Sequence, residues 1–154
     1  MGMTIVVGAD DAGFSYKEVL RDVLAQDDRV SEVIDVGVAA DQSTPYPRVG
    51  IAAAEMVADG RADRALLVCG TGLGMAISAN KVTGVRAVTA HDAYSVERSV
   101  LSNDAQVLTL GARVIGLELA KKLVGEWLSH RFDASSPSAA KVDLIQAYEA
   151  EDRA

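Results

Sequence analysis

Residues 65–81 read ALLVCGTGLGMAISANK, and this stretch predicts a strand, a glycine turn and a helix in direct succession. Ala65–Cys69 is a continuous apolar run, as expected of a strand that is buried on both faces of a sheet. Glycines then permit a sharp turn, and a helical pattern follows over Gly74–Lys81. A strand that leads straight into a helix is the repeating unit of an α/β fold.

The same alternation extends outward from this stretch in both directions. Further strands are expected at 4–9, 32–36, 85–90 and 106–110, and further helices at 16–25, 49–58, 93–101, 117–128 and 140–150. Strand–helix alternation throughout the chain predicts a doubly wound parallel sheet. Because such sheets bind ligands at the carboxyl ends of their strands, a site is expected in the loops that follow the five strands.

The composition is that of a single globular domain. The chain has 154 residues, 49% hydrophobic and 24% charged, and no apolar run approaches the roughly 20 residues of a membrane span. The formal net charge of −7 argues against a general nucleic-acid-binding protein, which needs a basic face. A single cysteine excludes an internal disulfide framework, and no export signal is apparent, so the cytoplasm is the expected compartment.

The loop from Cys69 to Gly74, CGTGLG, is suited to an anion. Gly70, Gly72 and Gly74 let the backbone approach a ligand, and the following helix offers free N–H groups at its positive end. No Gly-Lys-Ser/Thr follows, so this is not a Walker loop. The first strand ends in GADDAG, which disfavours a nicotinamide-dependent enzyme. A tight turn with no further role is the alternative.

Cys69 is the only cysteine, and it sits where the third strand ends and a helix begins. The positive end of a helix favours a thiolate, so a thiol placed there can serve as a base or nucleophile. The alternative is a small buried apolar side chain, the commonest fate of a lone cysteine. Thr71 could orient the thiol or could simply cap the helix. Position alone leaves both interpretations open.

Polar candidates also follow other strands. Asp10 and Asp11 come after the first strand, where carboxylates either cap a helix or hydrogen-bond a polyol. Tyr46 lies in Thr-Pro-Tyr-Pro, an expected loop, where its ring could pack or its hydroxyl could touch a ligand. Arg113 follows the fifth strand, and His91 follows the fourth. A surface arginine is usually solvated, but one at this edge can pair with a phosphate.

Four segments together resemble the ribose-5-phosphate isomerase B family, which includes the galactose-6-phosphate isomerase subunits. They are GADDAGF (8–14), TPYP (44–47), CGTGLGMAISANKVTGVRA (69–87) and NDAQVLTLGARVIG (103–116). The similarity runs in order over roughly residues 3–150. The resemblance implies a Rossmann-like three-layer α/β/α sandwich with a five-stranded parallel sheet and an extra C-terminal helix. It also implies a homodimer, often paired into tetramers, whose active sites lie between subunits.

The resemblance further implies aldose–ketose isomerisation of a small sugar phosphate, without cofactor or metal. By analogy, Cys69 shuttles a proton between C1 and C2, and Thr71 polarises it. The amides of Gly70, Gly72 and Gly74 would hold the enediolate oxygen, as expected for proton abstraction next to a carbonyl. The substrate-binding residues implied in this way are Asp10, Asp11, Tyr46, Ser102 and Asn103, with Arg113 and Lys141 at the phosphate.

Three positions depart from the family pattern. Asp11 stands where the family usually has a histidine, in Asp-His-Ala-Gly. Ser102 stands where the family usually has the histidine that opens the sugar ring. In the family, a late segment carries two arginines toward the partner's phosphate site. In this chain only Lys141 remains, near the position of the second arginine.

These departures favour a substrate that forms no ring, because a ring-opening histidine is then unnecessary. The predicted reaction converts D-erythrulose 4-phosphate to D-erythrose 4-phosphate, and the close alternative is ribose-5-phosphate isomerase. A galactose-6-phosphate isomerase and a non-catalytic sugar-phosphate-binding protein are less favoured, since Cys69 and Thr71 are intact.

A homodimer is also expected from the apolar residues of the last two helices. One domain over residues 1–154 is predicted to leave some of them uncovered, namely Trp127, Leu128, Leu144 and Ile145. The C-terminal helix, at about 138–150, is therefore predicted to pack on the partner subunit. His130 ends the fifth helix, where a cation suits the helix dipole, so a structural role is expected for it.

Overall fold

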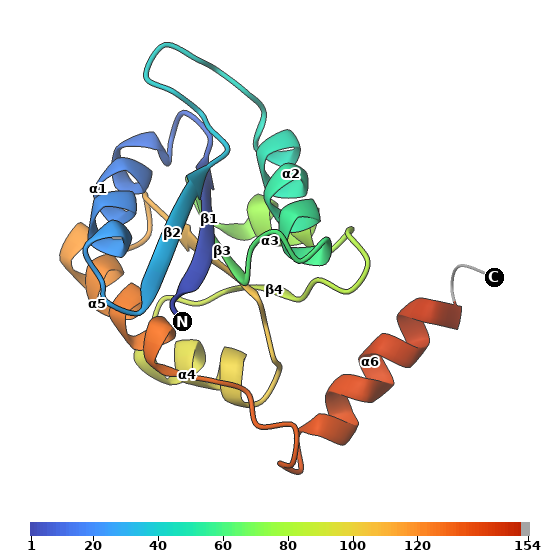
Figure 1. The fold of residues 1–154 in the computed structure, drawn as a ribbon. Coiled ribbons are helices and arrows are strands. Elements are labelled where there is room, and N and C mark those ends of the chain that lie inside the picture. Colours follow the sequence, from blue (N-terminus) through green and yellow to red (C-terminus); the bar gives the residue numbers. More distant parts are fainter. Residues whose placement is uncertain (152–154) are drawn as a thin grey trace.

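The structure, a computed structural model, describes residues 1–151 and contains a five-stranded parallel sheet (Figure 1). The strands are β1 (Met3–Ala9), β2 (Val30–Asp35), β3 (Arg64–Cys69), β4 (Ala87–Thr89) and β5 (Val107–Gly111), in the order β2-β1-β3-β5-β4. The helices are α1 (Phe14–Ala25), α2 (Tyr46–Ala58), α3 (Leu73–Ala79), α4 (Ala93–Leu101), α5 (Leu117–Ser129) and α6 (Ala139–Glu151). The predicted parallel α/β fold is confirmed.

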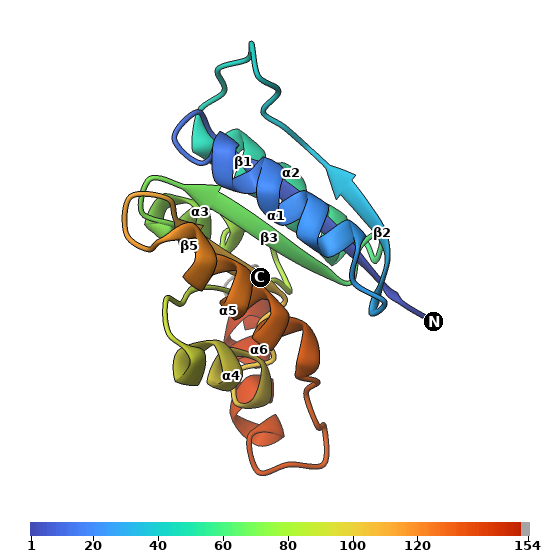
Figure 2. The ribbon, with the colours of Figure 1, turned by 90° about the vertical axis from the view of Figure 1, so that its left-hand side faces the viewer.

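Helices cover both faces of the sheet, as the two views show (Figures 1 and 2). One core cluster packs α1, α4 and α5 against the sheet and includes Leu20, Val96 and Trp127. The other packs α2 and α3 and includes Ala53 and Met75. Successive residues of a strand point to opposite faces, so a strand between two helical layers must be apolar throughout. This requirement explains the continuous apolar runs in the sequence.

The carboxyl ends of β1, β3 and β5 finish together at the middle of the sheet. Ala9 is in register with Val68, and Cys69 is in register with Gly111. Strand β2 lies on one side of β1, and the chain then crosses to form β3 on the other side of β1. The direction of the connections therefore reverses between β1 and β3. Such a switch point leaves an open crevice above the strand ends, where α/β proteins bind ligands.

The structure corrects three details of the sequence analysis. The expected strand 85–90 shortens to Ala87–Thr89, and Tyr46 begins α2 instead of lying in a loop. Its neighbour Pro45 serves as the N-cap and Pro47 lies in the first turn, where a missing N–H costs nothing. Trp127 and Leu128, expected to stay uncovered, are buried within this chain, because α5 packs its apolar face on the sheet.

Helix α6 differs from the other helices because it leaves the body of the domain (Figure 1). Val142 is its single buried residue, whereas Leu144, Ile145 and Tyr148 are exposed. The carboxylate of Glu149 accepts a hydrogen bond from the Gly84 amide at 2.8 Å. Within residues 1–151, no helix is both long enough and apolar enough to cross a membrane.

Candidate active site

The Cys69–Gly74 loop forms the centre of the site. Cys69 is the last residue of β3 and is 4% exposed. Its Sγ accepts a hydrogen bond from the Gly72 amide at 3.1 Å, and the Leu73 amide donates to Thr71 Oγ1 at 3.3 Å. The first hydrogen bond of α3 runs from the Ala76 amide to the Gly72 carbonyl. The Gly72 amide, expected at the enediolate, is thus used by the thiol, whereas the Gly74 and Met75 amides lack helical partners and are available to an anion.

Two threonines hold Gly72, the residue whose amide contacts the thiol. Gly72 has φ +82°, a left-handed conformation that favours glycine. Its carbonyl accepts hydrogen bonds from Thr109 Oγ1 at 2.8 Å and Thr89 Oγ1 at 3.2 Å, and the two hydroxyls lie 2.7 Å apart. The sequence analysis missed both threonines, because threonine is an ordinary strand residue. The available signal was a polar residue, Thr109, within the apolar run of β5.

Tyr46 and Arg113 border the loop from either side. A Cβ on Gly74 would lie 2.4 Å from the Tyr46 ring, so the ring rests directly on this glycine. A Cβ on Gly70 would lie 3.3 Å from Arg113 Nη1, which places the guanidinium against the other end of the loop. The Arg113 amide also donates to the Gly70 carbonyl at 3.0 Å. Both residues therefore lie beside glycines of the loop.

The turn after β1 lies against the end of β3. A Cβ on Gly13 would lie 2.2 Å from the Val68 carbonyl oxygen, which shows how closely the two segments approach. Asp10 Oδ1 accepts a hydrogen bond from the Gly13 amide at 3.0 Å, as a turn-capping carboxylate does. Asp11 is exposed, and its Oδ2 accepts a hydrogen bond from Ser43 Oγ at 2.8 Å. Ser43 is a third residue that the sequence analysis missed.

His91 joins the site through the backbone of β5. Its Nε2 accepts a hydrogen bond from the Gly111 amide at 2.9 Å, and Gly111 is the register partner of Cys69. Burial lowers the pKa of His91, because it disfavours the imidazolium, while the Asp92 carboxylate opposes the shift. A proton on Nε2 would also remove the acceptor of the Gly111 amide. His91 is therefore held as a neutral ring with its proton on Nδ1.

This pairing predicts a loss of stability on acidification. The pKa of His91 in the folded chain lies below the unfolded value of about 6.5, so below that pH the unfolded chain binds more protons and stability falls. We expect the Tm of the wild type to fall more between about pH 7.5 and about pH 5.5 than that of His91→Gln, whose amide oxygen accepts the same hydrogen bond without titrating. Equal falls in both proteins would contradict the assignment.

Among the described residues, Ser102, Asn103 and Lys141 make no hydrogen bond to the Cys69–Gly74 loop of their own chain, and Asn103 lines a separate pocket with Thr89 and Ala90. Helix α4 runs from the carboxyl end of β4 back toward the start of β5, and its nine residues span about 14 Å. Ser102 and Asn103 follow it, and the Asn103 carbonyl accepts from Arg86 Nε, just before β4. Lys141 is exposed in the first turn of α6, which starts on the opposite side of the domain from the carboxyl ends of the strands (Figure 1).

One group of possible metal ligands lies elsewhere. Glu97, Glu126 and His130 place ligand atoms within 4.8 Å of one another, between α4 and α5. His130 Nε2 lies 3.1 Å from Glu126 Oε1, in agreement with a structural role at the end of α5. The Cys69–Gly74 loop is not part of this group.

A thiol on a loop of backbone donors, at the switch point of a parallel sheet, defines an α/β enzyme equipped to move a proton next to a carbonyl group. Comparison with known proteins makes the class specific. The family model described as Ribose/Galactose Isomerase matches residues 5–145. The chain therefore belongs to the ribose/galactose isomerase family, and it is an aldose–ketose isomerase.

Individual relatives agree with this assignment. The chain is 66% identical over 150 residues to D-erythrulose-4-phosphate isomerase 2 of Mycolicibacterium smegmatis, covering 97% of this chain and 99% of the relative. It is 43% identical to the D-erythrulose-4-phosphate isomerase of Pectobacterium atrosepticum, covering 98% of each chain. The solved ribose-5-phosphate isomerase B of Clostridium thermocellum superposes with a TM-score of 0.91 at 40% identity, covering 97% of this chain and 99% of that one.

Proposed function

We propose that this isomerase interconverts D-erythrulose 4-phosphate and D-erythrose 4-phosphate, with Cys69 as the base. The proposal rests above all on the 3.1 Å hydrogen bond from the Gly72 amide to Cys69 Sγ. This backbone donor holds the sulfur against the glycine loop, where a cysteine is placed to accept the proton that the reaction moves. The names of the two D-erythrulose-4-phosphate isomerases support the choice of a tetrose phosphate.

The reaction moves two protons and neither adds nor removes any other atom. Cys69 Sγ takes a proton from C1 of the ketose, which produces an enediolate, and then returns it to C2. A hydroxyl proton passes from O1 to O2 in the same exchange. The developing charge on oxygen would be held by the free amides of the loop, such as that of Gly74, in the manner of an oxyanion hole. Thr71 Oγ1 lies on this loop and would polarise the thiol.

The remaining contacts follow from the walls of the loop. Tyr46 and Asp10 flank it and would hold sugar hydroxyls, with Asp11 beside them. Arg113 lies against Gly70 and offers a planar cation to the phosphate, which arginine binds with two parallel hydrogen bonds. This arrangement separates the phosphate end from the proton-transfer end of a short substrate.

We propose that a partner subunit completes the site and that the protein is a homodimer. Helix α6 exposes Leu144, Ile145 and Tyr148 and needs an apolar surface to cover them. Ser102, Asn103 and Lys141 lie away from Cys69 in their own chain, so they would serve the partner's site. Sedimentation that finds a fully active monomer at assay concentrations would contradict the dimer.

The substrate is tested with a panel of sugar phosphates. A pentose 5-phosphate closes a furanose ring through its C4 hydroxyl, and an enzyme that uses it benefits from a histidine that opens the ring. In a tetrose 4-phosphate this oxygen is esterified, so the ring cannot form. Asp11 and Ser102 occupy the positions of the family's histidines, and an open-chain substrate tolerates this change because it has no ring to open.

We therefore expect a higher kcat/KM for D-erythrulose 4-phosphate than for D-ribulose 5-phosphate or D-ribose 5-phosphate under the same conditions. A galactose 6-phosphate sample extends the panel to hexoses. A higher value for ribose 5-phosphate would overturn the choice of substrate, and no turnover of any sugar phosphate would overturn the proposed catalytic role of Cys69.

A further inference from the structure

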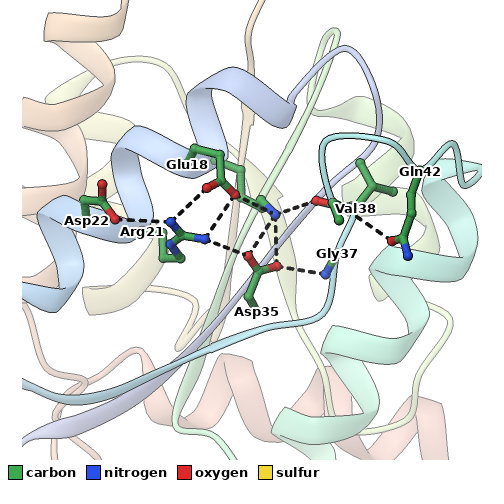
Figure 3. Close-up of polar contacts among 9 residues, drawn as sticks. Glu18, Arg21, Asp22, Asp35, Gly37, Val38 and Gln42 are labelled. Atoms are coloured by element: carbon green, nitrogen blue, oxygen red, sulfur yellow. Dashed lines mark hydrogen bonds and ion pairs between the residues drawn. The ribbon is translucent and has the colours of Figure 1, made fainter.

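Lys17 is a buried cation outside the machinery described above. Its side chain is 2% exposed and lies on the first turns of α1. Its Nζ donates to Asp35 Oδ1 at 3.0 Å, to Asp35 Oδ2 at 2.8 Å and to the Val38 carbonyl at 2.7 Å (Figure 3). Glu18 Oε1 lies 3.1 Å from the same nitrogen, and the Phe14 ring centroid lies 5.3 Å away. A charge this deep is tolerated only when it is fully paired.

These contacts fix the segment that leaves β2. Asp35 is the last residue of β2, and its Oδ1 also accepts from the Gly37 amide at 2.8 Å. Backbone hydrogen bonds tie the same segment to β1, from the Ala9 amide to the Gly37 carbonyl and from the Val38 amide to the Ala9 carbonyl. Lys17 thus adds a third attachment, from α1, to residues 35–38. These residues begin the β2–α2 connection and are called its root below.

Beyond this root the connection has little support of its own. Residues 39–44 rise away from the domain before α2 begins (Figures 1 and 2). Ala39 and Gln42 bond to each other, through the Ala39 amide to Gln42 Oε1 and the Gln42 amide to the Ala39 carbonyl. Within residues 1–151, the hydrogen bond that joins 39–44 to another part of the domain is the one from Ser43 Oγ to Asp11 Oδ2. A cavity of about 510 Å³ lies beneath the root, lined by Lys17, Arg21 and Gln42 among others.

The connection leads directly to the residues that border the glycine loop on this side, namely Asp11, Ser43 and Tyr46, which are called the substrate wall below. Ser43 holds the Asp11 carboxylate, and three residues later Tyr46 lays its ring on Gly74. Both contacts lie on the segment that follows the root of this connection. Cys69, Gly72 and Thr109, by contrast, are held by β3 and β5 and do not depend on it.

We propose that Lys17 is a positioning residue for the isomerase: by pinning the root at Asp35 and Val38, it sets the Asp11–Ser43 pair and Tyr46 against the glycine loop. This inference rests on the proposed function, which assigns those residues to the substrate. Because it acts on the binding wall and not on the proton transfer, Lys17 governs KM more than kcat.

The test compares Lys17→Met with a matched control. Arg64 is the other buried cation within residues 1–151, and it donates to the Trp127 and His130 carbonyls at 2.7 Å each, at the amino end of β3. In Lys17→Met, Asp35 retains Arg21 at 3.4 Å and the Gly37 amide, so its charge keeps partners.

We expect Lys17→Met to raise KM for D-erythrulose 4-phosphate about tenfold, with kcat within about threefold, since a lost contact to the substrate wall weakens binding of substrate and transition state equally. Arg64→Met is expected to lower Tm while leaving KM within about twofold.

Two further variants keep the inference falsifiable if Lys17→Met does not fold. Lys17→Arg restores the cation toward Asp35, and we expect its KM to return to within about threefold of the wild type. Asp35→Asn removes the paired charge without changing the shape, and its KM is expected to rise about threefold or more. If another sugar phosphate of the panel has a higher kcat/KM than D-erythrulose 4-phosphate, KM is measured with that sugar phosphate instead.

Tyr46→Ala separates the failure of this inference from that of the proposed site. If Tyr46→Ala raises KM but Lys17→Met behaves like Arg64→Met, the positioning role of Lys17 is wrong and the substrate wall stands. If Tyr46→Ala leaves KM unchanged, the substrate wall itself is wrong, and with it the route by which Lys17 acts. A fall in kcat with unchanged KM in Lys17→Met would also overturn the inference.

Discussion

Replacing Cys69 with alanine is expected to lower kcat by about 10² to 10⁴, the usual contribution of a general acid–base group. The reason is that Cys69 Sγ is the group that the Gly72 amide faces, so the loop would have no proton acceptor without it. The side chain is small, so the fold should survive its removal. The measurement is kcat with D-erythrulose 4-phosphate, together with Tm.

Cys69→Ser is the companion variant, because it keeps the size of the side chain and replaces the thiol with a much weaker acid. We expect its kcat to fall nearly as far as that of the alanine variant, with Tm close to the wild type. Binding of the substrate should persist in both, as measured by calorimetry. A loss of less than about tenfold in kcat would mean that another group removes the proton.

Replacing Gly72 with alanine is expected to lower kcat/KM by about 10²-fold or more and to lower Tm. Gly72 has φ +82°, and a Cβ there would lie 3.0 Å from the Leu110 carbonyl carbon, 3.0 Å from Thr89 Cγ2 and 3.1 Å from Thr109 Oγ1. Gly72 is held through its amide by Cys69 Sγ and through its carbonyl by Thr109, so this residue cannot shift without releasing the thiol. Small displacements of such groups have large kinetic effects.

Gly84→Ala provides a control with the same backbone angle. Gly84 also has φ +82°, but a Cβ there would meet no atom within 4 Å. The left-handed strain of about 1–2 kcal/mol is therefore common to both variants, and the steric conflict is specific to Gly72. We expect Gly84→Ala to lower Tm while leaving kcat/KM within about threefold. If the two variants lost activity equally, strain and not the loop geometry would explain the effect.

The sequence predicted the fold class and the central loop because both are encoded locally. A strand between two helical layers must be apolar along its whole length, so Ala65–Cys69 is recognisable from composition alone. The glycines that follow fix the turn, and Cys69 lies at its start. Family membership, inferred from the same block, is confirmed by the family model over residues 5–145.

The contacts around the loop were decided only by the tertiary structure. Thr109 reaches Gly72 across 37 positions, and Lys17 reaches Val38 across 21, because of the strand order β2-β1-β3-β5-β4. A periodic pattern of apolar residues gives the elements but not which of them are neighbours. The sequence analysis assigned Ser102 and Asn103 to the site by family resemblance alone, and in the structure both follow α4, where the Asn103 carbonyl accepts from Arg86 Nε.

The sequence by itself determined which residues are candidates for the chemistry, since a lone thiol, a glycine loop and an arginine can be read directly from it. The tertiary structure decided how these groups are oriented relative to one another. The hydroxyls of Thr89 and Thr109 hold the Gly72 carbonyl, and the Gly72 amide faces Cys69. Because backbone amides and carbonyls are present in every residue, the sequence does not show which of them make these contacts. Their direction depends on long-range packing, which no local pattern specifies.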